Sequence, residues 1–92
     1  MHDHSTERDP ADEDAKFQRL VLELVLEVHP AQLTKAELIR EATDDPESFT
    51  QRDGTTRAVR DLTRVGVLHR HGDFVLPTRA ALHINELWGV IA

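Results

Sequence analysis

The chain has 92 residues, a net charge of −6 at pH 7 and no cysteine. This length is that of one small domain, and the lack of cysteine excludes disulfides, thiolate zinc sites and cysteine nucleophiles. No apolar run approaches the ~20 residues that span a bilayer, and the acidic N-terminus does not resemble a signal peptide, so we expect a cytoplasmic protein with no membrane partner.

The charges are segregated along the chain. Residues 1–14 hold six acids and one arginine, whereas residues 49–79 hold six arginines and three aspartates. Residues 1–14 also lack periodic apolar positions, so we expect a disordered acidic tail ahead of one domain over residues 15–92. For a polyanionic partner, the local positive field of residues 49–79 matters more than the net charge.

Apolar residues at helical spacing predict a first helix over residues 15–29, which Pro30 ends. Leu22 and Leu26 point away from the main apolar face of this helix. A helix with apolar groups on two sides is usually covered on both. We therefore expect either the C-terminal helix or a second copy of the chain to cover these two leucines.

A short extended link with room for one brief strand leads to a second helix. Thr34 and Glu37 have the spacing of a capping box at its start, and the helix is expected to end near Thr43. Its buried side is expected to consist of Ala36, Leu38, Ile39 and Ala42.

The third helix has two alternative starts. Ser48 and Gln51 have the spacing of a capping pair, and Asp53 is a second candidate cap. Phe49 is expected to pack under the preceding turn. The predicted buried face consists of Ala58, Leu62 and Val65, with Val59 at its margin.

The opposite face of this helix is rich in donors. At ~100° per residue it gathers Thr56, Arg57, Arg60, Thr63 and Arg64. Gly66 ends the helix, and two short alternating runs separated by Gly72-Asp73 then predict a tight β-hairpin with Arg70 near its tip.

A last helix over residues 78–92, capped by Thr78, carries a broad apolar stripe and is expected to pack or to dimerise. A two-fold dimer and a monomer whose last helix folds back on the first both satisfy this pattern. The residues expected at a homodimer interface are Leu22, Leu26, Ile84, Trp88 and Ile91.

The segments LTKAELIREA and TTRAVRDLTRVGVLHRHGDFVL, in this order, resemble a winged helix-turn-helix domain over roughly residues 17–77. The arginine-bearing third helix ends in Arg64-Val65-Gly66-Val67-Leu68 and enters a hairpin at once. The resemblance implies a mainly α fold with a small β-hairpin (α+β), in which a three-helix core carries a wing and an extra C-terminal helix. The connection between the second and third helices is longer than in the simplest members.

The resemblance also implies a small prokaryotic-type transcriptional regulator that reads double-stranded DNA. The third helix would enter the major groove and the hairpin would touch the backbone or the minor groove. Arginine can bond the edge of guanine or clamp a phosphate with two donors, and threonine is a short donor. The expected DNA contacts are Arg52, Thr55, Thr56, Arg57, Arg60, Thr63, Arg64 and Arg70.

Other functions receive less support from the sequence. Winged domains also dock proteins, so a protein–protein interaction module is the alternative. An enzyme is not expected, because there is no Gly-rich phosphate loop, nucleophile elbow or zinc-hydrolase motif, and we expect no catalytic residue and no cofactor. His69, His71 and Asp73 alternate along the hairpin, but three exposed ligands without a fourth predict no metal site.

Overall fold

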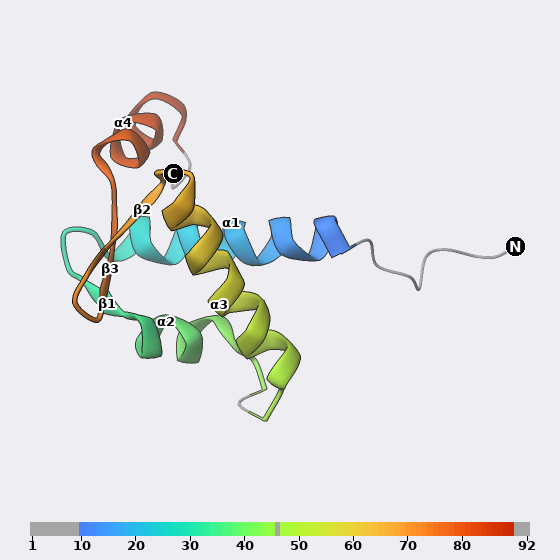
Figure 1. Ribbon diagram of the computed structural model, residues 1–92. Coiled ribbons are helices and arrows are strands. Elements are labelled where there is room, and N and C mark those ends of the chain that lie inside the picture. Colours follow the sequence, from blue (N-terminus) through green and yellow to red (C-terminus); the bar gives the residue numbers. More distant parts are fainter. Residues whose placement is uncertain (1–9, 46, 90–92) are drawn as a thin grey trace, which may run out of the picture.

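The computed structural model describes residues 10–45 and 47–89, which form four helices and a small antiparallel sheet (Figure 1). The elements are α1 (Pro10–Val28), β1 (Leu33–Thr34), α2 (Lys35–Ala42), α3 (Phe49–Arg64), β2 (Leu68–His71), β3 (Phe74–Pro77) and α4 (Arg79–Trp88). This arrangement confirms the predicted α+β class, mainly helical with a small sheet. None of these helices is long and apolar enough to cross a bilayer.

One core joins the helices to the sheet. Helix α3 crosses α1, and the hairpin of β2 and β3 lies beside both helices (Figure 1). The buried cluster consists of Phe17, Val21, Val25, Leu38, Ala58, Val59, Leu62, Leu68 and Val75. Because these side chains come from α1, α2, α3, β2 and β3, the position of α3 depends on all of them.

Helix α1 begins at Pro10, five residues before its predicted start. Proline suits the first turn because the N–H that it lacks would have no partner there, and Asp12 and Glu13 complement the positive end of the helix dipole. The acidic segment predicted as a tail to residue 14 is therefore helical from Pro10 onward. Residues 1–9 lie outside the described part of the chain.

The sheet has three antiparallel strands in the order β1-β3-β2. The predicted brief strand is its first strand, in which Leu33 pairs with Val75. Directly after this strand, the backbone N–H of Lys35 donates to the carbonyl oxygen of Asp73 (3.0 Å). The start of α2 is thus fixed directly to the turn of the hairpin.

The capping box predicted for α2 is confirmed. The backbone N–H of Thr34 donates to Glu37 Oε1 (2.8 Å), and the backbone N–H of Glu37 donates to Thr34 Oγ1 (3.1 Å). The predicted end is also confirmed, since α2 ends at Ala42 and Thr43 is its C-cap. Both ends of this short helix are therefore encoded locally.

Ser48, not Asp53, caps α3, because its hydroxyl accepts from the backbone N–H of Gln51 (3.2 Å). The prediction for Phe49 is wrong, since 72% of this residue is exposed. Phe49 precedes Ala58 by nine residues, which places it half a helical turn from the buried face. Val65 is also exposed, because the helix ends at Arg64 and Val65 is its C-cap.

Helices α1 and α3 approach closely at Gly54. A Cβ atom at this position would lie 2.6 Å from Cε2 and 2.7 Å from Cδ2 of Phe17. Gly54 is buried, and the ring of Phe17 is buried against it. The absence of a side chain at residue 54 therefore sets the distance between the two helices.

Helix α4 packs on β3 and is anchored at its start. The hydroxyl of Thr78 donates to the carbonyl oxygen of Gly66 (2.8 Å), and its backbone N–H donates to that of Val67 (3.1 Å). The predicted cap is confirmed, since Thr78 Oγ1 accepts from the backbone N–H of Ala81 (3.2 Å).

A single chain covers the two leucines of α1 that were assigned to a dimer interface. Leu26 is only 6% exposed, and Leu22 is half-buried and packs against the core. Leu26 therefore has almost no surface left for a second copy, which corrects its assignment. Ile91 lies outside the described residues.

Candidate nucleic-acid interface

A shallow groove runs between α2 and α3 and ends at the hairpin. It consists of three adjoining hollows of about 220, 450 and 320 Å³. The first two share Ala36 and Ile39, and the last two share Lys35 and Arg70. We call it the α2–α3 groove. It is lined by α2 and its flanking caps (Thr34 to Thr43), by one face of α3 (Arg52 to Thr63), and by Arg70 and Asp73.

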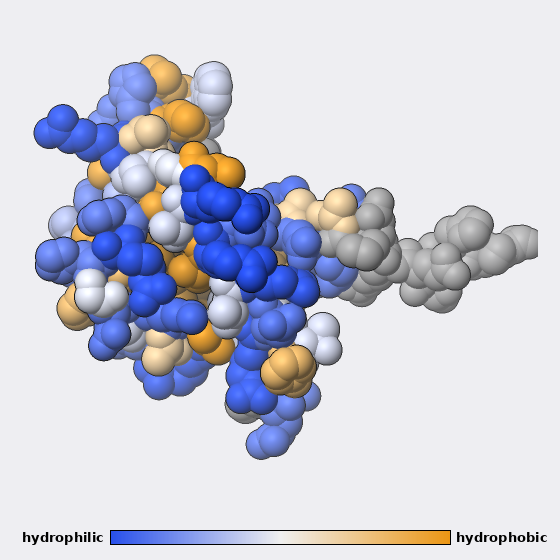
Figure 2. Space-filling view, viewed as in Figure 1, coloured by the Kyte–Doolittle hydropathy of each residue, from blue (hydrophilic) through white to orange (hydrophobic). Residues whose placement is uncertain are grey.

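Positive charge dominates this groove. The five cations that line it are Lys35, Arg40, Arg52, Arg60 and Arg70. Among its lining residues, Asp73 is the one carboxylate, and it lies at the hairpin turn. Hydrophilic side chains cover α3 and the side of the molecule toward the hairpin, with a smaller hydrophobic area between them (Figure 2). The positive charge is therefore held at a concave surface, where it can surround an anion.

The α3 side of the groove follows from helical spacing. Arg52, Thr56, Arg60 and Thr63 succeed one another by three or four residues and share one face. The hydroxyls of Thr56 and Thr63 donate to the backbone carbonyls of Arg52 (2.9 Å) and Val59 (2.7 Å). Each hydroxyl must therefore turn away from the helix before it can donate to a ligand.

Arg70 lies on the inner face of the sheet, which differs from the predicted wing-tip position. It pairs with Val75, and it lies two residues after the buried Leu68, so both side chains are on the same side of β2. Its side chain therefore lies against α3, where it lines the same hollow as Arg60. Its Nη2 donates to the carbonyl oxygen of Gly72 at 3.4 Å, at the long end of the range.

The Nε atom of Arg70 is buried and has no hydrogen-bond partner among the described residues. A buried donor without an acceptor is costly, and such atoms usually find a partner. Because this Nε atom is buried, the Arg70 side chain must turn before it can donate to an anion in the hollow beside Arg60.

Arg57 lies on the other flank of α3 and is engaged by acids. Its Nη2 contacts Asp14 Oδ1 of α1 (3.1 Å), and its Nη1 contacts Asp53 Oδ2 one turn earlier (3.2 Å). Its side chain therefore joins α1 to α3. Sequence reasoning assigned it to a ligand because Asp14 is 43 positions away.

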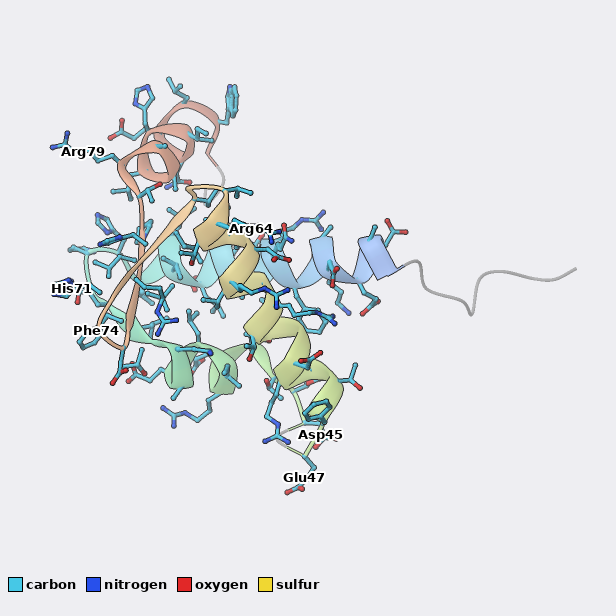
Figure 3. All side chains as sticks on the ribbon, in the orientation of Figure 1. Asp45, Glu47, Arg64, His71, Phe74 and Arg79 are labelled. Carbon is cyan, nitrogen blue, oxygen red and sulfur yellow. The ribbon has the colours of Figure 1, made fainter. Side chains whose placement is uncertain are left out.

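Asp61 forms ion pairs with two arginines at the end of α3. Its Oδ1 contacts Arg60 Nε (3.3 Å) and Arg64 Nη2 (3.2 Å). Arg64 lies exposed near the end of α3 (Figure 3). It does not line the groove. Exposed ion pairs contribute little to stability, so an anionic ligand that binds these guanidinium groups more tightly than Asp61 can displace its carboxylate.

Thr55 cannot contact a ligand, which corrects its prediction. It is 0% exposed, and its hydroxyl donates to the backbone carbonyl of Gln51 (2.9 Å). Because α3 begins at Phe49, its buried face extends one turn further upstream and includes Gly54 and Thr55. Threonine fits there because its hydroxyl bonds within the helix while its methyl group can pack.

Lys35 and Arg40 were missed by sequence reasoning, which assigned no contact to α2. Both flank two apolar residues that were predicted to be buried, but Ala36 is exposed and Ile39 is half-buried. These two form the apolar floor of the groove. The sequence did contain a signal for this surface, since each of these two cations is next to an apolar residue on a helix of only about two turns.

The carboxylate of Glu37 is held at the start of α2. The backbone N–H of Thr34 and then its hydroxyl lower the pKa of Glu37, with a smaller contribution from Arg40. Its charge is therefore committed to the helix cap, and it does not line the groove.

Within residues 10–45 and 47–89, no three histidine, aspartate or glutamate side chains are grouped so that they could hold a metal ion. Comparison with models of protein families, with curated proteins and with solved structures finds no match to the chain. Functional inference therefore depends on the geometry of the α2–α3 groove.

Proposed function

We propose that this chain is a small transcriptional regulator of the winged-helix type, which binds double-stranded DNA through the α2–α3 groove. The observation that carries the proposal is the alignment of five cations along one groove in a chain whose net charge is −6. Neutralising phosphates with lysine and arginine supplies most of the affinity in such complexes.

The hollow of about 320 Å³ beside the hairpin is the proposed phosphate site. Lys35, Arg60 and Arg70 converge on it from α2, α3 and β2. The backbone N–H groups of Lys35 and Glu37 in the first turn of α2 already donate to the carbonyl oxygen of Asp73 and to Thr34 Oγ1. The side chains of the three cations therefore bind the phosphate.

The remaining cations extend the contact along the DNA. Arg52 lies two turns before Arg60 on the same face of α3, so it can reach a base edge or a second phosphate. Arg40 lies across the groove on α2. Arg64 borders this face and is a weaker contact, because it lies outside the groove.

The order of elements supports the winged-helix assignment. Helix α3 is followed after three residues by a hairpin, and β1 adds the third strand. The hairpin wing would thus contribute Arg70 from its inner face rather than from its tip.

The test is titration of a fluorescent duplex by anisotropy across a salt series. Contact with about four to six phosphates predicts a slope of log K against log salt of roughly −4 to −5. A flat slope, or no binding at the lowest salt concentration, would contradict the proposal.

Alanine variants locate the contact. Arg60→Ala and Arg70→Ala should each weaken binding and reduce the slope by about 0.9 for each phosphate that the variant no longer neutralises. Arg19→Ala is the matched control, because it removes the same charge from an exposed position on α1, outside the groove. An equal decrease in affinity in all three variants would show that only the net charge matters and would refute the groove as the site.

A protein-docking module is the second candidate function. The observation that favours it is the apolar floor of Ala36 and Ile39, together with the exposed Phe49 at the start of α3. A partner with an acidic, apolar segment would fit this end of the groove. Failure of the chain to bind any duplex at low salt would favour this function over DNA binding.

A further inference from the structure

Helix α4 carries an apolar stripe that no part of the described chain covers. Ile84, Leu87 and Trp88 are 41%, 60% and 76% exposed, and Ala80 on the same side is also exposed. Residues 80, 84 and 87 follow the four-and-three spacing of a helix-packing seam. Ala81 lies next to Trp88 around the helix and is buried, and Leu82 and Asn85 are half-buried, so α4 is fixed to the domain by the side that adjoins the stripe.

We propose that the α4 stripe binds the α4 stripe of a second copy of this chain, with the two helices antiparallel about a two-fold axis near Ile84. In this register Ile84 lies against its own counterpart. Trp88 lies opposite Ala80 of the second copy, so the largest side chain of the stripe meets the smallest. Such large-to-small matching allows two helices to interdigitate at one interface.

The charges beside the stripe favour the same arrangement. Arg79, His83 and Glu86 form a polar strip on one flank of α4, with Arg79 at its start and Glu86 toward its end. An antiparallel pair brings the Arg79 end of one helix beside the Glu86 end of the other. In a parallel pair the polar strips of the two helices would instead lie on opposite sides of the interface, and Arg79 would not meet Glu86 of the second copy.

The proposed interface leaves the α2–α3 groove free. Helices α4 and α2 lie at opposite ends of the sheet (Figure 1). A ten-residue helix is only about 15 Å long. The total surface that two such stripes can bury is therefore near about 1,000 Å², the lower limit for specific association. We therefore expect a dimer that dissociates on dilution, and this inference does not depend on DNA binding.

The first test measures molar mass by sedimentation across a range of protein concentrations without DNA. The parent chain should pass from monomer to dimer, and Leu87→Glu should raise the dissociation constant more than about tenfold, because it would bury a carboxylate. Phe49→Glu is the matched control, since it adds the same charge to an exposed apolar position on α3. It should leave the dissociation constant unchanged.

Trp88 is the one tryptophan of the chain and reports on the same equilibrium. Its emission should shift to shorter wavelength as the parent chain is concentrated, and it should not shift in Leu87→Glu. Far-UV circular dichroism should confirm that both variants fold. A chain that stays monomeric at all concentrations, or a dimer that Leu87→Glu leaves intact, would overturn the proposal.

A charge exchange tests the antiparallel arrangement. Arg79→Glu and Glu86→Arg should each raise the dissociation constant about two- to fivefold, the range for exposed ion pairs. The double variant should return to the parent value, because each pair is restored with reversed signs. If the double variant is as weak as the two single effects combined, the helices do not pair in this way.

Discussion

Replacing Gly54 by alanine should destabilise this protein, although the same change in most helices is stabilising. Alanine is favoured over glycine inside a helix by about 1 kcal/mol. At residue 54, however, the new methyl carbon would lie 2.6 Å from the ring of Phe17, whereas carbon atoms pack at about 3.5–4.0 Å. The ring or α3 must therefore move by about 1 Å.

Overpacking of this kind costs about 1–3 kcal/mol, which exceeds the gain in helix propensity. We expect a net loss of about 1 kcal/mol, which corresponds to a fall in Tm of roughly 4–8 °C for a domain of this size. Urea unfolding followed by circular dichroism measures it. Phe17→Leu provides the control, because without the ring Gly54→Ala should become neutral or stabilising. An unfolding free energy raised by Gly54→Ala in the parent chain would refute the close approach of α1 and α3.

Four further predictions concern the capping box of α2 and the ion pair between α1 and α3. Thr34→Ala should lower the free energy of unfolding by about 1 kcal/mol in urea titrations, because it removes the capping hydroxyl of α2. The contribution of Glu37 should be complete above about pH 4.3, its pKa in an unfolded chain, and be lost as the pH falls through its lower folded pKa. Glu37→Gln should therefore reduce the loss of stability on acidification, and an unchanged pH profile would argue against the capping box. Asp14→Asn should cost less than about 1 kcal/mol in the same urea titration, since its pair with Arg57 is partly exposed. Arg57→Ala should leave DNA affinity near that of the parent, and a decrease equal to that of Arg60→Ala would contradict the division of α3 into two flanks.

Local signals in the sequence predicted the elements whose bonds are local. Thr34 with Glu37 and Thr78 are caps whose partners lie three residues away, so spacing alone identified them. The start of α3 had two candidates, so it was open whether Phe49 belongs to the helix. With Ser48 as the cap, Phe49 lies in the helix nine residues before Ala58 and is exposed, whereas Thr55 lies three residues before Ala58 and is buried.

The candidate site was predicted on α3 alone because its other side depends on tertiary contacts. Spacing along one helix identified the face that holds Thr56, Arg60 and Thr63. Helical spacing could not show that α2 brings Lys35 to the same hollow. Nor could it show that Arg70 reaches this hollow from the inner face of the sheet.

Strand β1 has a kinetic consequence for any ligand of the groove. Its pairing with β3, and the bond from Lys35 to Asp73, hold α2 and the hairpin together before a ligand arrives. The two walls of the hollow therefore need not move toward each other, and little ordering entropy is lost on binding. Association should then be limited by electrostatically steered diffusion, so that salt acts chiefly on the rate of encounter. A wing free to swing would instead show a slow step that salt does not change.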